Sequence, residues 1–236
     1  MKKNILPLFI ALTTLAFTGA VKPVLQHKLH ISDPSDIALL PNHHLLIASD
    51  DGRLYETTAD GQNLRYINLG FDAEGVCLVN DTAWVVDEST REVYAIHTGT
   101  FKKIRTVPLS YGGGRNAGFE GITFNPENRH FYLLTEKKPV ALLEYNEAWQ
   151  LISSQELHGI RDASSIYWYN RQLYVLSDED HCIVTIDTEG NTHAVGKLPI
   201  YNPEGLAITA DSAYVVSDDM NALYIFLTRD IFTHEK

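Results

Sequence analysis

One pattern recurs five times along this chain of 236 residues, and it constrains the fold more than any other feature. Each copy has a turn-like lead, a Glu or Ser, then a Gly, Asp or Ser, and an aliphatic residue that opens a strand. The five copies read SDPSDIALL, FDAEGVCLV, AGFEGITFN, RDASSIYWY and YNPEGLAIT. They begin roughly 40 residues apart, which is the period of a four-stranded propeller blade. The sequence therefore predicts an all-β, five-bladed β-propeller.

The remainder of each copy supports four strands per blade. In the second copy TAWVVDE and EVYAIH form the second and third strands, and the more polar KKIRTVPL forms the fourth. A polar outermost strand fits the water-facing rim of a propeller. The fifth copy lacks this strand, whereas VLQHKLHI at residues 24–31 resembles it. We therefore predict a single domain over residues 24–236 in which the N-terminal strand closes the ring; an open β-sandwich, the alternative, would leave five matched copies to coincidence.

The first twenty residues have the layout of a secretory signal peptide. Lys2 and Lys3 precede an uncharged run from Ile5 to Phe17, and small residues follow at 18–20. A membrane span needs about 20 apolar residues, more than this run supplies. Residues 1–20 are therefore interpreted as a signal peptide, with an uncleaved anchor as the alternative. Either way we expect an exported product, periplasmic or anchored to the bacterial inner membrane facing the periplasm.

The charge balance excludes one class of partner. The formal net charge is −11, and removal of the two N-terminal lysines would make it −13. Such a body repels phosphate backbones, so nucleic acid is not expected as a partner, whereas cations are. The two cysteines, Cys77 and Cys182, fall in the second and fourth copies. We expect them on non-adjacent blades as buried thiols without a disulfide.

Two sets of polar residues are predicted to converge on one mouth of the central channel. The first strand of each blade lines the channel, and its start meets the end of the antiparallel second strand at the same face. The starts carry Ser35, Glu74, Glu120, Ser164 and Glu204, and the ends carry Asp50, Glu88, Glu136, Asp178 and Asp218.

Crowded carboxylates repel one another, so a cation or protonation stabilises them. Oxygen ligands favour hard ions, and calcium tolerates irregular geometry. The predicted calcium ligands are Glu74, Glu120, Glu204, Asp218, Asp178 and Glu88. Further mouth residues are Asp50, Glu136, Ser35, Ser164 and Arg115, the last in the glycine-rich insertion at 112–116. Alternatively, such carboxylates only accept backbone N–H groups in recurring turns.

The leads DAEG, GFEG and NPEG, with the acidic corners after each second strand, resemble the SdiA-regulated (YjiK-like) family of bacterial exported or inner-membrane-anchored proteins. The resemblance runs from about Val24 to Phe226 and implies a five-bladed propeller with a calcium site, distantly related to NHL-repeat propellers. The pattern is also similar to gluconolactonase-like propellers, where residues placed like Glu204 and Asp218 hold a catalytic ion. This sequence departs from those in blade count and in lacking their Glu-Gly-Pro signature.

Two functions fit these observations. The first is a module that binds calcium, or another divalent cation, and an unidentified small molecule or envelope protein; its oligomeric state is left open, with a monomer favoured. The second is a metal-dependent hydrolase of lactones, esters or phosphoesters, with a carboxylate as base. The first is preferred because the acidic residues are accompanied by no evident substrate-orienting set, and no catalytic residue is assigned.

Overall fold

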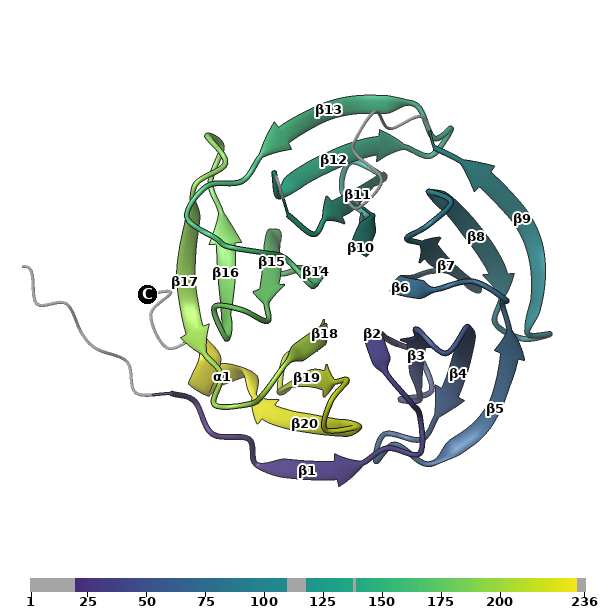
Figure 1. Ribbon diagram of the computed structural model, residues 1–236, viewed down its shortest axis with the longest axis horizontal. Helices are drawn as coiled ribbons and strands as arrows, with labels where there is room; N and C mark the ends of the chain where they lie inside the picture. Colours follow the sequence, from purple (N-terminus) through teal and green to yellow (C-terminus); the bar gives the residue numbers. More distant parts are fainter. Residues whose placement is uncertain (1–19, 110–117, 138, 233–236) are drawn as a thin grey trace, which may run out of the picture.

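The strands of this chain form five antiparallel sheets arranged as a ring around a central channel (Figure 1). The computed structural model describes residues 20–109, 118–137 and 139–232. Each sheet has four strands, and the innermost strand of each faces the channel. The prediction of a five-bladed, all-β propeller is confirmed.

Four blades follow one another along the chain. Blade 1 comprises β2 (Pro34–Leu39), β3 (Leu45–Ser49), β4 (Arg53–Thr57) and β5 (Asn63–Asn68); blade 2 comprises β6 (Ala73–Val79), β7 (Thr82–Asp87), β8 (Glu92–His97) and β9 (Lys102–Pro108). Blade 3 comprises β10 (Phe119–Asn125), β11 (His130–Thr135), β12 (Ala141–Asn146) and β13 (Leu151–Glu156); blade 4 comprises β14 (Ser165–Tyr169), β15 (Gln172–Ser177), β16 (Cys182–Ile186) and β17 (Thr192–Lys197).

Blade 5 joins the two ends of the chain. Its strands β18 (Pro203–Ile208), β19 (Ser212–Ser217) and β20 (Ala222–Leu227) are completed by β1 (Leu25–Lys28), which pairs antiparallel with β20. The backbone N–H of Val24 also donates to Ile225 at 2.8 Å, and that of Leu29 to Asn221 at 2.7 Å. The N-terminal strand therefore closes the ring as predicted, and it leaves β20 without an open edge.

The hydrophobic core lies between neighbouring blades. Strands such as β3 and β7 are rich in β-branched and aliphatic residues that fit a pleated, buried surface. Between blades 5 and 1, for example, Ile37 and Ile47 pack with Val216, and each is at most 1% exposed. Full burial of one such side chain stabilises the fold by roughly 1.5–3 kcal/mol. Each blade therefore shares a buried hydrophobic cluster with both of its neighbours.

Glycine lets the innermost strands approach one another closely. A Cβ on Gly75 in β6 would lie 2.9 Å from the Cα of Gly121 in β10. A Cβ on Gly205 in β18 would lie 2.6 Å from the Cα of Asp36 in β2. Both distances are below any normal contact, and the opposing atoms are backbone. The glycine that follows each lead Glu is therefore required by the narrow ring of inner strands.

A short helix, α1 (Thr228–Ile231), follows β20 and was not expected from the sequence. Ile231 is 1% exposed and lies against Gly196 of β17, where a Cβ would come within 3.0 Å of its side chain. The helix thus covers part of the core of blade 4. In the described part of the chain, no helix has the length and apolar character needed to cross a membrane. The predicted signal segment lies almost wholly outside the described residues.

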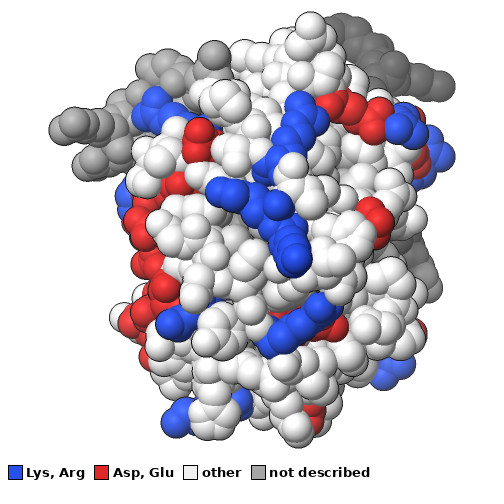
Figure 2. All heavy atoms as spheres, turned by 90° about the vertical axis from the view of Figure 1, so that its right-hand side faces the viewer, with Lys and Arg blue, Asp and Glu red and all other residues white. Residues whose placement is uncertain are grey.

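Charge is distributed unevenly over the molecule. Seen from the rim, Asp and Glu gather along one edge, whereas Lys and Arg lie across the rim itself (Figure 2). Strand β9, on the side shown, carries the exposed Lys102, Lys103 and Arg105. The acidity that dominates the sequence is therefore concentrated away from the outer strands.

Cys77 in β6 and Cys182 in β16 are buried free thiols in separate blades.

Candidate metal centre

A β-bulge at the start of four inner strands aims the lead residue into the channel mouth. In blade 2, Ala73 pairs with Asp87 and Gly75 with Val86, so the intervening Glu74 has no partner in the register. The same shift occurs around Ser35, Glu120 and Glu204. A bulge inserts one extra residue and redirects its side chain. The repeated lead therefore has two parts: a bulged residue that faces the mouth, and a small residue that permits close strand packing.

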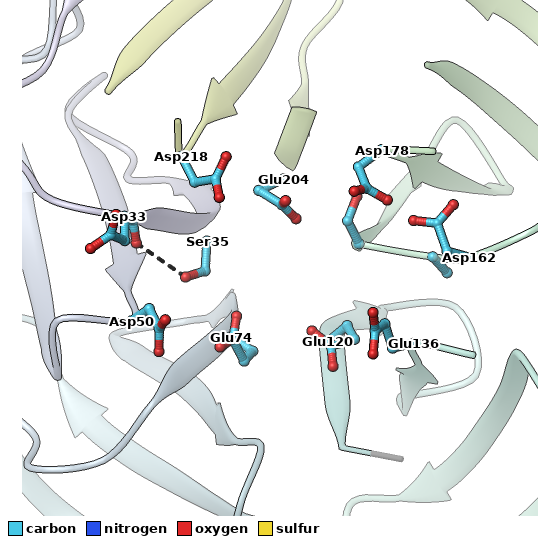
Figure 3. A pocket seen from close by; sticks show the side chains of 12 residues that line it. Asp33, Ser35, Asp50, Glu74, Glu120, Glu136, Asp162, Asp178, Glu204 and Asp218 are labelled. Atoms are coloured by element: carbon cyan, nitrogen blue, oxygen red, sulfur yellow. Dashed lines mark hydrogen bonds between the residues drawn. The ribbon is translucent and has the colours of Figure 1, made fainter. Parts of the chain in front are cut away.

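These residues surround a cavity of about 160 Å³ at one end of the channel (Figure 3). We call this cavity the acidic mouth, and Glu74, Glu120 and Glu204 the mouth glutamates. All five blades contribute to its lining: Asp33, Ser35, Asp50, Glu74, Glu120, Glu136, Asp162, Ala163, Ser164, Asp178, Glu204 and Asp218. No Lys, Arg or His belongs to this lining among the described residues. Apart from Glu88, the two predicted sets thus meet in this lining.

The mouth glutamates are half-buried and surrounded by like charge. Burial, followed by repulsion from Glu74 and Glu88, raises the pKa of Glu120 to about 9. Burial and neighbouring carboxylates likewise raise the pKa of Glu74 and of Glu204 to about 8. Near neutral pH these groups therefore favour a bound proton or a bound cation over free charge.

The second set divides into different environments. Burial is the largest cause of the raised pKa of Asp50, Asp178 and Asp218. Asp178 also accepts the N–H of Glu179 at 2.7 Å, and Asp218 accepts the N–H of Asp219. Both therefore cap a turn while they line the acidic mouth, so capping does not keep either side chain out of the cavity.

Glu88 and Glu136 lie at the margin of this set. Glu88 is outside the lining; its side chain packs against Gly118, where a Cβ would come within 1.9 Å of its Cγ. Its charge nevertheless raises the pKa of Glu74 and of Glu120. Glu136 forms an ion pair with Lys137, the nearest described cation. Arg115 lies outside the described residues.

The sequence reasoning missed two carboxylates of the lining, Asp33 and Asp162. Each stands two residues before the Ser that replaces the lead Glu in blades 1 and 4, so an acidic group is retained there. Asp162 is 2% exposed and accepts the hydroxyl of Ser177 at 2.5 Å. An alignment of the five leads contains this signal, because Asp72 occupies the same position in blade 2.

A single side chain ties opposite blades together beneath the acidic mouth. Asp36 occupies the position that is Gly75 in blade 2, and it is 1% exposed. Its carboxylate accepts the N–H of Val76 at 2.8 Å and the hydroxyl of Ser165, across the channel in blade 4, at 2.8 Å. Ser165 in turn accepts the N–H of Leu206 at 3.2 Å. Burial raises the pKa of Asp36 to about 8. Asp36 and Ser165 directly follow the lining residues Ser35 and Ser164, and we call this network the floor of the acidic mouth.

The donor chemistry of the acidic mouth fits a hard divalent cation. Carboxylate and hydroxyl oxygens line it, and calcium takes 6–8 oxygen ligands including water. Within residues 20–109, 118–137 and 139–232, no three carboxylate, imidazole or thiol side chains are close enough to form a ready-made site. The lining is thus a ring of separated donors, and an ion held there would have to draw several of them inward.

Comparison with solved structures shows the same fold in diverse proteins. The glutaminyl cyclase of Myxococcus xanthus is 12% identical, with a TM-score of 0.69 over 89% of this chain and 100% of that one. A Bacteroides caccae protein of unknown function is 16% identical, with a TM-score of 0.57 over 77% and 69%. Virginiamycin B lyase of Staphylococcus aureus is 12% identical, with a TM-score of 0.53 over 82% and 66%. At these identities the likeness extends to the fold alone.

The family comparison covers most of the sequence. The SdiA-regulated family matches residues 30–228, which include every blade-forming strand except β1. The matched range contains all five leads and the whole lining of the acidic mouth. Together with the five-bladed ring, this match shows that the chain belongs to the SdiA-regulated family.

Proposed function

We propose that this chain is an exported module that binds a divalent cation, calcium in preference to others, at the acidic mouth. The observation that carries the proposal is the convergence of carboxylates from all five blades on one cavity without a cationic side chain in its described lining. Such an arrangement stores electrostatic repulsion that a bound cation relieves. Calcium suits it better than magnesium, because magnesium demands near-ideal octahedral geometry.

Within this proposal the residues have distinct roles. The mouth glutamates would supply the main ligands, since their bulges direct them at the cavity. Asp178, Asp218 and Asp50 would complete the sphere or orient bound water. When bound, the ion would supply positive charge at the channel axis. The module would then present a neutralised face to a small molecule or to an envelope protein.

Calcium titration of the chelator-treated chain tests the proposal. Isothermal titration calorimetry and thermal unfolding should both give a saturable response to calcium, because an ion bound only by the native state stabilises it. Magnesium, manganese and zinc should give smaller responses. Glu120→Gln should weaken calcium affinity at least tenfold. Glu127→Gln, at the far end of the same β10–β11 hairpin, should leave it unchanged. No response to any cation by the metal-free chain would refute the proposal.

A hydrolytic role is the second candidate, favoured by one observation. The mouth glutamates remain partly exposed, so an ion among them could keep a water position open to substrate. Two proteins of similar fold are a cyclase and a lyase, although that likeness concerns the fold alone. A panel of lactones and phosphoesters, assayed with and without calcium, separates the two functions. Calcium-dependent turnover that is lost in Glu120→Gln would favour the hydrolase.

Export is proposed from the N-terminal sequence, in which Lys2 and Lys3 precede the uncharged run Ile5 to Phe17. Cell fractionation with N-terminal sequencing tests it. The chain should be recovered from the periplasm starting near Val21, or from the inner membrane with residues 1–20 retained. Recovery of the uncleaved chain from the cytoplasm would contradict the proposal.

A further inference from the structure

The channel has a second mouth, where the lining side chains are largely apolar. The inner strands start at the acidic mouth, and the ends of β2, β6, β10 and β14 surround a second cavity of about 140 Å³. Leu39, Leu78, Phe124 and Trp168 are half-buried in its lining. No Asp, Glu, Lys, Arg or His belongs to this lining in the described part of the chain. We call this cavity the apolar mouth.

Along the inner strands, the floor described above lies between the residues of the two mouths. Asp36 accepts hydrogen bonds from Val76 in β6 and Ser165 in β14. In both strands, the residues that line the apolar mouth follow these two residues. Cys77 and Tyr167 belong to the lining of the apolar mouth, and burial, with a smaller contribution from Asp36, raises the pKa of both groups. Ions at the acidic mouth and molecules at the apolar mouth would therefore occupy separate compartments.

Thr123 brings a hydroxyl group to the lining of the apolar mouth. Thr123 is 4% exposed, and its Oγ1 accepts the backbone N–H of Trp168 at 3.0 Å. The O–H of Thr123 donates to no acceptor among the described residues, so it is free to donate to a bound molecule. A buried donor without an acceptor costs about 1–3 kcal/mol, which a ligand oxygen would recover.

We propose that the apolar mouth binds a small, uncharged aromatic molecule that carries one hydrogen-bond acceptor. The volume of about 140 Å³ sets the size, because a cavity of about 150 Å³ accepts a benzene ring. The lining sets the charge, because it offers a charged ligand no side chain of opposite sign. The half-buried rings of Phe124 and Trp168 offer faces and edges for aromatic packing. The hydroxyl of Thr123 sets the orientation.

Fluorine NMR with 4-fluorophenol as the probe tests this site. The native chain should broaden and shift the probe signal saturably, with a Kd below about 1 mM. Fluorescence of Trp168 should change over the same concentrations, and Trp168→Phe should remove that change. 4-Fluorobenzoate, the anionic counterpart, should bind at least tenfold more weakly. Glu120→Gln should bind the phenol like the native chain, which separates this site from the acidic mouth.

Substitutions in the lining locate the probe. Leu78→Trp should fill the cavity and abolish binding, whereas Ile152→Trp on the exposed face of β13 should not. Thr123→Ser keeps the hydroxyl and should keep the affinity. Thr123→Val should weaken 4-fluorophenol at least fivefold and leave 4-fluorotoluene unchanged. If Leu78→Trp fails to fold, as judged by circular dichroism, Leu39→Trp takes its place.

Three outcomes would overturn the proposal. The first is the absence of saturable binding up to 10 mM probe, roughly tenfold above the Kd limit set above. The second is equal binding by the cavity-filling variant and the native chain. The third is a Gly-Tyr-Gly peptide that binds much more tightly than the free phenol, since that would assign the apolar mouth to an aromatic side chain of a protein partner.

Discussion

Replacement of Gly205 by alanine should weaken the closure between blades 5 and 1. The new Cβ would lie 2.6 Å from the Cα and 2.9 Å from the carbonyl carbon of Asp36, and 2.7 Å from a methyl of Val216. Carbon atoms pack best at about 3.5–4.0 Å, so the two inner strands must separate by roughly 1 Å. The methyl of Val216 can rotate, whereas the backbone of Asp36 cannot.

The cost follows from two contributions. Overpacking of a tight core costs about 1–3 kcal/mol. Displacement of Asp36 also lengthens its hydrogen bonds to Val76 and Ser165, both now 2.8 Å, and each contributes about 1 kcal/mol. Alanine also reduces the conformational entropy of the unfolded chain, which offsets up to about 1 kcal/mol of this loss. The net loss is about 2–4 kcal/mol, which lowers the Tm by roughly 5–15 °C for a domain of this size.

Urea unfolding followed by tryptophan fluorescence measures this loss. Gly99→Ala is the matched control, because its Cβ would meet only the imidazole of His97, which can move aside. The control should change the free energy of unfolding by less than about 0.5 kcal/mol. A similarly small change in Gly205→Ala would show that the ring adapts easily and would refute the reasoning.

Three further predictions concern the channel and the thiols. The mouth glutamates have raised pKa values in the folded state, so the native state holds protons that the unfolded chain has released. The free energy of unfolding of the metal-free chain, measured by urea titration, should therefore fall as pH rises from about 5 to 9. Saturating calcium should make this pH dependence weaker. Asp36→Ala should lower the free energy of unfolding by about 2–4 kcal/mol, because the N–H of Val76 and the hydroxyl of Ser165 lose their buried acceptor. The isosteric Asp36→Asn should recover part of this free energy. Cys77 and Cys182 have pKa values raised by burial, so Ellman's reagent should label them only in urea, and rapid labelling of the native chain would contradict their placement.

The repeat made the fold predictable because each copy carries the same lead, strand order and period. Closure by the N-terminal strand followed from a count of strands rather than from propensity. The position of the mouth glutamates could also be predicted from the repeat, because every inner strand starts at the same face of the ring. All of these predictions depend on the strand pattern within single copies of the repeat, and none depends on contacts between blades.

What the repeat could not reveal depends on contacts across the ring. Asp36 and Ser165 occupy the glycine position of non-adjacent blades, and only the curvature of the whole ring brings them to 2.8 Å. The carboxylates of Asp33 and Asp162 were not predicted, because they precede the inner strands in turns whose path the strand pattern does not determine. The apolar mouth was not predicted, because each of its lining residues, such as Leu78, has the pattern of an ordinary buried strand residue within its own copy.

The pairing of β1 with β20 also determines the order in which the molecule can be completed. These partners are separated by almost the whole sequence, and such long-range contacts slow folding. A chain synthesised or translocated from its N-terminus must hold residues 25–28 unpaired until residues 222–225 arrive. Blades 1 to 4 can assemble in sequence, but the last interface forms only when the chain is complete. A nascent or truncated form therefore presents two open edges, and its protection by chaperones matters most just before closure.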